Sequence, residues 1–247
     1  MPVFDIASDA EREMHVITAD NLTKTYRAGD VEVQAVRGVT FSVEPASFVS
    51  FVGPSGSGKS TLLNMIGCLD RPTGGSLSVL GTDVAGLDRR ASAAFRGRNV
   101  GFIFQDFNLV PVLTVYENVE YPLIMVQSWP AAKRRERIMS LLDAVGMADQ
   151  AEKRPDQISG GQKQRVAVAR ALAPDAKLIL ADEPTANLDQ ATAIRVIDLM
   201  RQLRDDLGVT FVFSTHDPKV MAEAEVTFHL QDGALIEREE HRAAANA

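Results

Sequence analysis

The amino-acid sequence predicts an α/β fold, and three observations support this prediction. Short apolar runs rich in β-branched residues alternate with segments of helical periodicity along the 247 residues. The runs at 177–182 and 209–214 are almost continuously apolar, which is typical of parallel strands buried on both faces of a sheet. A third run, at 47–52, leads into a glycine-rich loop and then into a helical segment.

The N-terminal part of the chain is expected to be rich in β-structure. The segments 15–19, 31–36 and 38–43 are short and β-branched, and turn residues separate them. A helix is expected over 58–69, directly after the glycine-rich loop. Residues 74–110 are interpreted as short strands and turns.

The middle of the chain, residues 114–150, is expected to be helical. Thr114 and Glu117 match the capping-box pattern T-x-x-E. A further helix has Pro130 in its first turn and ends at Gly146. These start and stop signals predict two helices in this part of the chain.

Two more helices complete the pattern. One begins near Ser159 and must end by Pro174, and another occupies roughly 190–206, between the two apolar strands. The arrangement is an α/β core with a mainly helical insertion around 90–160 and an antiparallel β portion near the N-terminus. The charged tail, 237–247, is expected to be frayed.

Composition limits the classes of function. The net charge of −7 argues against a non-specific nucleic-acid binder, which usually has a basic excess. The single cysteine, Cys68, excludes an intrachain disulfide and fits a cytosolic setting. Residues 1–14 are acidic and do not resemble a secretory signal, and the longest uncharged run, 45–58, is too short to span a bilayer. The protein is therefore expected to be soluble, or attached to a membrane only through a partner.

The glycine-rich loop carries a phosphate-binding motif. Gly53, Gly58, Lys59 and Ser60 satisfy G-x-x-x-x-G-K-[ST] between a predicted strand and a predicted helix. In this context the glycines let backbone N–H groups approach phosphate oxygens, and the helix N-terminus favours an anion. Lys59 is expected to reach the β- and γ-phosphates and Ser60 to ligate Mg²⁺. The alternative, a glycine turn of chance resemblance, does not explain the flanking elements.

Polar side chains follow two other buried strands. Asp182 and Glu183 end the strand at 177–182, and His216 follows the strand at 209–214. Ligands bind outside the carboxyl ends of strands in open α/β sheets, so these residues are expected to converge on the phosphate loop. Asp182 is placed to hold Mg²⁺, and Glu183 to orient or deprotonate the attacking water. A solvated acidic turn is the alternative explanation for Asp182 and Glu183.

A second phosphate-facing element is expected at 158–170, "ISGGQKQRVAVAR". Ser159 and Gln162 form an S-x-x-Q capping pair, and two adjacent glycines leave N–H groups available to an anion. A helix cap without a ligand would not need both glycines.

These motifs resemble those of the ATP-binding cassette family, and the resemblance covers nearly the whole chain. "GPSGSGKST" is similar to the Walker A loop, "LILADE" to the Walker B strand and "ISGGQ" to the family signature. "GFIFQD" is similar to the Q-loop, "NLD" to the D-loop and "LTKTY" to the segment whose aromatic residue stacks on adenine. The resemblance implies that nucleotide is bound by Tyr26, Gly53, Ser55, Gly56, Ser57, Gly58, Lys59, Ser60, Thr61, Ser159, Gly160, Gly161, Gln162 and Asp189.

The same resemblance implies an ATPase with ATP and Mg²⁺ as cofactors. Glu183, His216 and Gln105 would be catalytic, and Ser60, Gln105 and Asp182 would ligate the metal. The implied architecture is a single nucleotide-binding domain, 1–247. It has a P-loop NTPase core with a mainly parallel sheet, an N-terminal antiparallel β portion, and an α-helical subdomain inserted in the RecA-like core at roughly 90–174.

Family members pair head to tail, so the signature of one copy completes the phosphate site of the other. The implied partners are a second copy of this chain, transmembrane permease subunits and a periplasmic adaptor, and the implied location is the cytoplasmic face of the inner membrane. The subgroup resembled most is that of macrolide exporters and lipoprotein-releasing transporters. A non-transport envelope complex, such as a cell-division regulator, is the alternative. Soluble cassettes of DNA repair or translation carry coiled-coil insertions or two cassettes, which this chain lacks. His15, His229 and His241 stand in no recognisable pattern, and we assign them no role.

Overall fold

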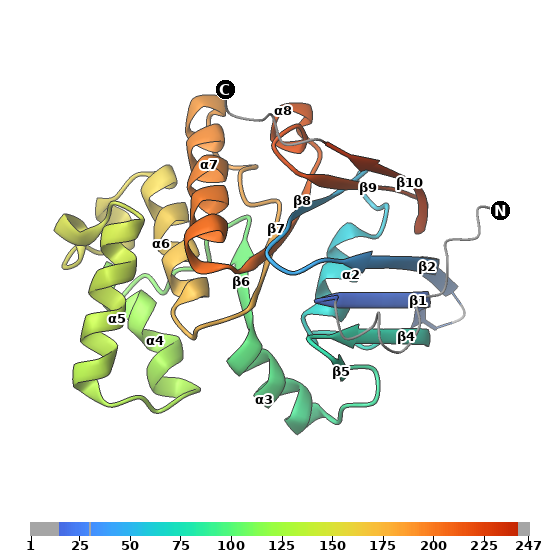
Figure 1. Cartoon of the computed structure of the whole chain (residues 1–247), viewed down its shortest axis with the longest axis horizontal. Helices are drawn as coiled ribbons and strands as arrows, with labels where there is room; N and C mark the ends of the chain where they lie inside the picture. The colour runs from blue at the N-terminus through green and yellow to red at the C-terminus, as the bar shows by residue number, and fades with distance from the viewer. Residues whose placement is uncertain (1–14, 30, 242–247) are drawn as a thin grey trace. The chain divides into compact units, whose positions relative to one another are not determined.

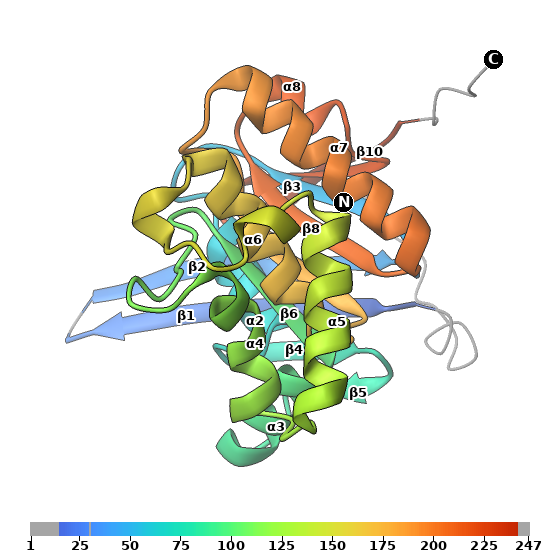
Figure 2. The ribbon, with the colours of Figure 1, turned by 90° about the vertical axis from the view of Figure 1, so that its left-hand side faces the viewer.

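The computed structural model describes residues 15–29 and 31–241. The chain divides into two compact units, which are residues 1–93 with 214–247 (the first unit) and residues 94–213 (the second unit). Figure 1 labels most of the helices and strands of both units, and Figure 2 labels β3.

The first unit contains the predicted antiparallel sheet. Its strands lie in the order β2-β1-β4-β5. β1 is Ile17–Ala28, β2 is Val31–Val43, β4 is Gly74–Val79 and β5 is Thr82–Asp83. β1 is longer than the predicted segment 15–19, and the two segments predicted after it are one continuous strand, β2, which pairs with β1 along its length.

A second group of strands in the first unit carries the phosphate loop. β3 (Phe48–Val52) is buried at all five positions and pairs in parallel with β9 (Val226–Gln231). β10 (Ala234–Glu240) pairs antiparallel with β9. The helices α2 (Lys59–Ile66) and α8 (Pro218–Met221) complete the unit.

Aromatic packing fixes these strands against each other. Phe51 on β3 lies 5.3 Å from Phe41 on β2 and 5.3 Å from Phe228 on β9, measured between ring centroids. Such ring pairs add stability beyond the apolar area that they bury. The prediction of a frayed tail over 237–247 is wrong for residues 237–240, which belong to β10, and residues 242–247 lie outside the described range.

The second unit contains three parallel strands. β6 (Val100–Phe104) pairs with β7 (Leu178–Asp182), and β7 pairs with β8 (Thr210–Thr215), whose last two residues belong to the first unit. Every residue of β8 is buried, and so are four of the five residues of β7, as the apolar runs predicted. The α/β fold class is thereby confirmed.

Helices surround these strands within the second unit. They are α4 (Val115–Met125), α5 (Ala131–Ala144), α6 (Gly160–Leu172), α7 (Gln190–Leu207) and the short 3₁₀ helices η1 (Ala148–Gln150) and η2 (Pro155–Gln157). α4, α5 and α6 contact one another, and Figure 2 shows them grouped together. The capping box predicted at Thr114 and Glu117 is present at the start of α4.

The sequence did not predict the short helix α8 or the helix α3 (Arg89–Asn99), which occupies a stretch interpreted as strands and turns. Only Ser92 is buried in α3, so the sequence shows no apolar stripe that would reveal this helix. None of the helices within 15–29 and 31–241 is both long and apolar enough to cross a bilayer. The division into a core and an inserted helical subdomain at roughly 90–174 stays a prediction.

Candidate functional site

The phosphate loop of the first unit has a backbone that only glycine tolerates. Gly53 has φ +152° and Gly58 has φ +101°, and a Cβ atom would lie 2.1 Å from the Leu230 carbonyl oxygen at Gly53 and 2.4 Å from the Ala35 carbonyl oxygen at Gly58. Real Cβ atoms do not approach a carbonyl so closely. The glycines of the motif are therefore required by the fold of the loop as well as by any ligand.

Inside this loop, donors and an unpaired hydroxyl point to an anionic ligand. The ammonium of Lys59 is buried and donates hydrogen bonds to the carbonyl oxygens of Gly53 (2.8 Å) and Pro54 (3.0 Å). The hydroxyl of Ser57 is buried and has no hydrogen-bond partner among the described residues. α2 begins at Lys59 without a side-chain cap on Gly58. The start of a helix presents N–H groups that suit phosphate oxygens, and Gly58 has no side chain that could compete for them.

Tyr26, the predicted adenine-stacking residue, is held at its hydroxyl end. Its side chain is 40% exposed, and its hydroxyl donates a 2.6 Å hydrogen bond to Asp70 Oδ2. Lys24 Nζ lies 2.5 Å from Asp70 Oδ1 and 4.8 Å from the centroid of the Tyr26 ring. The ring therefore stands on the surface, held in one orientation at its hydroxyl end.

The charges of this cluster are stable around neutral pH. Burial by itself would raise the pKa of Asp70, but hydrogen bonds from Lys24 and Tyr26 outweigh it and hold that pKa below its ordinary value. Burial first, and then the hydrogen bond to Asp70, raises the pKa of Tyr26. Asp70 is thus a carboxylate and Tyr26 a neutral phenol across the physiological range.

His216 lies beside the phosphate loop within the first unit. It follows β8, its side chain is exposed, and a pocket of about 280 Å³ is lined by His216 together with Val52, Gly53, Pro54, Pro218, Met221 and His229. The predicted catalytic residue His216 and Gly53, the first residue of the phosphate loop, therefore share one pocket.

In the second unit, two predicted site residues follow neighbouring strands. Asp182 is the last residue of β7 and pairs in register with Phe104, the last residue of β6. Gln105 follows Phe104 directly, so the ends of both strands present an oxygen-bearing side chain at one edge. Glu183 comes next to Asp182 and has φ +48°, a left-handed conformation that is uncommon for a side chain of this kind. Such backbone strain clusters at functional sites.

The segment after Gln105 is fixed by side chains from two other elements. Asn187 Nδ2 donates to the carbonyl oxygen of Gln105 (3.1 Å) and to Asp106 Oδ1 (2.8 Å). The guanidinium of Arg170, on α6, donates to the carbonyl oxygens of Phe107 and Asn108, both of which have positive φ. Burial lowers the pKa of Arg170. The sequence motifs included Asn187 only as part of "NLD" and did not reveal Arg170.

The signature segment forms the predicted helix cap. Ser159 Oγ accepts from the Gln162 N–H (3.3 Å), and Gln162 Oε1 accepts from the Ser159 N–H (2.8 Å). The two glycines differ in their packing. A Cβ at Gly161 would lie 2.4 Å from Thr192 Cγ2, whereas a Cβ at Gly160 would meet nothing closer than Leu188 Cδ2 at 3.4 Å.

Packing against α7 therefore explains Gly161, but it does not explain Gly160. Asp189 caps α7 by accepting a hydrogen bond from the Thr192 N–H at 3.0 Å. Hydrogen bonds from the side chain and the backbone of Thr192 lower the pKa of Asp189. Asp189 thus has a structural role whether or not it also contacts a nucleotide.

The predicted site residues fall into two sets. Tyr26, the phosphate loop and His216 lie in the first unit, whereas Gln105, Asp182, Glu183, the signature and Asp189 lie in the second. The convergence of the two sets on one nucleotide stays a prediction. Asp70, the residue that holds Tyr26, was not predicted, because nothing in the sequence relates residues so far apart.

Comparison with known proteins finds relatives that cover most of the chain. Residues 36–186 match the profile of the ABC transporter family. The chain is 48% identical over 217 residues to an uncharacterized ABC transporter ATP-binding protein of Thermotoga maritima, with 87% of this chain and 92% of that protein aligned. It is 44% identical to the lipoprotein-releasing system ATP-binding protein LolD of Anaeromyxobacter dehalogenans, with 92% of this chain and 95% of that protein aligned.

Longer relatives match over only part of their length. The chain is 43% identical to the macrolide export ATP-binding/permease protein MacB of Syntrophobacter fumaroxidans, covering 90% of this chain but 31% of that protein. Among solved structures, the dimeric, post-hydrolysis ATP-binding cassette MJ0796 bound to ADP and phosphate aligns with a TM-score of 0.83 and 40% identity, covering 92% of this chain and 99% of the other.

Proposed function

Since the chain belongs to the ABC transporter family, we propose that it drives a membrane transporter by closing on ATP as a homodimer and reopening after hydrolysis. It is an ATP-binding subunit and an ATPase. The observation that supports a triphosphate ligand best is the phosphate loop, where the buried Lys59 ammonium and the unpaired Ser57 hydroxyl stand at the uncapped start of α2.

Mg²⁺ fits the oxygen donors that the site residues offer. Ser60, Gln105 and Asp182 supply a hydroxyl, an amide and a carboxylate oxygen, which are hard ligands of the type that Mg²⁺ prefers. The ion would neutralise charge on the phosphates when bound. Glu183 would act on the attacking water, because its strained backbone directly follows Asp182, which would ligate the metal.

A shared site accounts for the second phosphate-facing element. Nothing in the packing requires Gly160 to lack a side chain, and the capping box uses the Ser159 and Gln162 N–H groups while leaving the first helical N–H groups to another acceptor. The γ-phosphate of a nucleotide bound to the partner's phosphate loop is that acceptor in our proposal. The dimeric state of the cassette MJ0796 supports such pairing.

A membrane partner is expected at the second unit. α4 and the residue after it expose Tyr121 (49%), Ile124 (43%), Met125 (64%) and Val126 (48%), which is a large apolar content for one short helix. We propose that transmembrane permease subunits cover this surface and hold the chain at the cytoplasmic face of the membrane. The names of the MacB and LolD relatives support a cargo of the class of macrolides or lipoproteins, and we propose a periplasmic adaptor as a further partner.

Glu183→Gln tests this function. Loss of the carboxylate should slow ATP hydrolysis by about 10²- to 10⁴-fold, the usual contribution of a general base, while Mg-ATP still binds and the dimer accumulates in size-exclusion chromatography. Glu136→Gln, an exposed substitution on α5, is the matched control and should leave both properties unchanged. Near-normal turnover in Glu183→Gln would remove Glu183 from the mechanism, and a monomer in ATP would contradict dimer closure.

A further inference from the structure

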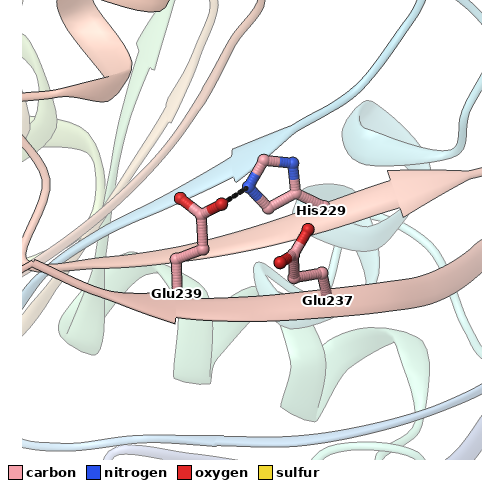
Figure 3. A group of neighbouring side chains, drawn as sticks. All are labelled: His229, Glu237 and Glu239. Carbon is pink, nitrogen blue, oxygen red and sulfur yellow. Dashed lines mark ion pairs between the residues drawn. The ribbon is translucent and has the colours of Figure 1, made fainter.

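A cluster of metal-ligating side chains lies on the β9–β10 hairpin of the first unit. His229 on β9 pairs in register with Glu237 on β10, and Glu239 lies two residues further along the same face (Figure 3). One ligand atom of each of the three residues lies within 4.8 Å of the others. Imidazole and carboxylate are the side chains that bind divalent transition metals such as Zn²⁺.

The spacing of the nearest two ligand atoms is that of a coordination sphere. His229 Nε2 lies 3.4 Å from Glu239 Oε1. Two ligands at about 2.0–2.2 Å from one ion in tetrahedral geometry stand roughly 3.3–3.6 Å apart. The contact between His229 Nε2 and Glu239 Oε1 is not a hydrogen bond, and this buried nitrogen has no hydrogen-bond partner among the described residues. A metal ion would satisfy that nitrogen.

Charge also favours a divalent cation. Glu237 and Glu239 are carboxylates on one face of one strand, and the nearby Arg238 belongs to the opposite face, where it pairs with Glu240 at 2.8 Å. Glu237 has no ion pair within residues 15–29 and 31–241. His241 Nε2 lies 3.7 Å from Glu239 Oε2 and 3.1 Å from Thr227 Oγ1, so Glu239 stands between two imidazoles.

We propose that His229, Glu237 and Glu239 bind one divalent transition-metal ion of the Zn²⁺ and Co²⁺ class per chain. The ion joins β9 to β10 through side chains in addition to the backbone ladder. The turn of the hairpin touches the phosphate loop, since the Gly233 N–H donates to the Ser57 carbonyl oxygen at 3.1 Å. Metal binding therefore rigidifies the β9–β10 hairpin, whose turn is hydrogen-bonded to the phosphate loop.

Spectroscopy with Co²⁺ tests the site directly. The full chain without an affinity tag is titrated with Co²⁺ in excess Mg²⁺ and without nucleotide, so that Mg²⁺ occupies oxygen-only sites. We expect visible ligand-field bands that saturate at one Co²⁺ per chain and disappear when Zn²⁺ is added. Absence of saturable bands, or bands that Zn²⁺ does not displace, would overturn the proposal.

Matched variants assign the ligands. Glu237→Gln removes an exposed carboxylate without threatening the fold. Both Glu237→Gln and His229→Gln should weaken Co²⁺ binding by at least about 10-fold, because even residues that only hydrogen-bond to a metal ligand contribute that much to metal affinity. Glu240→Gln, on the same strand but the opposite face, should bind Co²⁺ as the unmodified chain does. Equal affinity in Glu237→Gln and Glu240→Gln would place any bound metal elsewhere and contradict the site.

Discussion

Removing the hydroxyl of Tyr26 should weaken ATP binding without affecting the fold. In Tyr26→Phe the ring remains, but the 2.6 Å hydrogen bond to Asp70 is lost. ATP must then immobilise a ring that the protein previously held, which costs about 0.5–1.5 kcal/mol for one side chain. The dissociation constant of ATP should therefore rise about 2- to 10-fold. Asp70 keeps its bonds to Lys24 and the Arg71 N–H, so stability should hardly change.

Two further variants separate stacking from positioning. Tyr26→Ala removes the aromatic face as well, and loss of base stacking, about 1–3 kcal/mol, should raise the dissociation constant about 5- to 150-fold. Tyr26→Phe combined with Asp70→Ala should bind ATP no more weakly than Asp70→Ala alone, because both changes remove the same hydrogen bond. Isothermal titration calorimetry measures each constant. Unchanged affinity in Tyr26→Phe would refute the positioning role, and additive losses in the double variant would refute the shared bond.

Two further predictions concern stability. Gly161→Ala should lower the free energy of unfolding in urea by about 1–3 kcal/mol, because its methyl group would lie 2.4 Å from Thr192 Cγ2. Adding Thr192→Ser, which removes that Cγ2 atom, should restore most of the lost stability. A double variant as unstable as Gly161→Ala alone would contradict the contact. Because its folded pKa is lowered, Asp70 should add stability above pH 3.8, its ordinary pKa, and lose that contribution as the pH falls through the folded value. The stability difference between the unmodified chain and Asp70→Asn should therefore be constant from neutral pH down to pH 3.8 and shrink below it; a difference that shrinks well above pH 3.8 would contradict this.

Local signals in the sequence predicted those parts of the site that local structure builds. The glycines at 53 and 58, the capping pair at Ser159 and Gln162 and the carboxylate at Asp182 each depend on a few neighbouring residues. Strand and helix periodicity was strong there because the elements are buried on at least one face.

Parts of the structure that depend on pairing between distant residues were missed. The last four residues of β10 are all charged, so this segment resembled a solvated tail in the sequence, yet its backbone pairs with β9. His229 had no pattern in the sequence because its neighbours Glu237 and Glu239 reach it only through the register of that hairpin. α3 has no apolar stripe, and Asp70 reaches Tyr26 only through the fold.

In the proposed homodimer, each nucleotide site joins Lys59 of one copy to Ser159 and Gly160 of the other. Lys59→Ala cripples phosphate binding, and Gly160→Asp places a carboxylate against the γ-phosphate. When the two substitutions are on different chains of a mixed dimer, a shared site receives both defects and the other site stays intact. When both are on one chain paired with an unmodified copy, each shared site receives one defect.

Nucleotide occlusion in these two mixed dimers distinguishes a shared site from a site within one chain, because a lone intact site can trap nucleotide even if cooperativity silences its turnover. The shared site predicts more occluded nucleotide in the dimer with the substitutions on separate chains. More occluded nucleotide in the dimer with both substitutions on one chain would show that each site is built within a single chain and would refute the shared site.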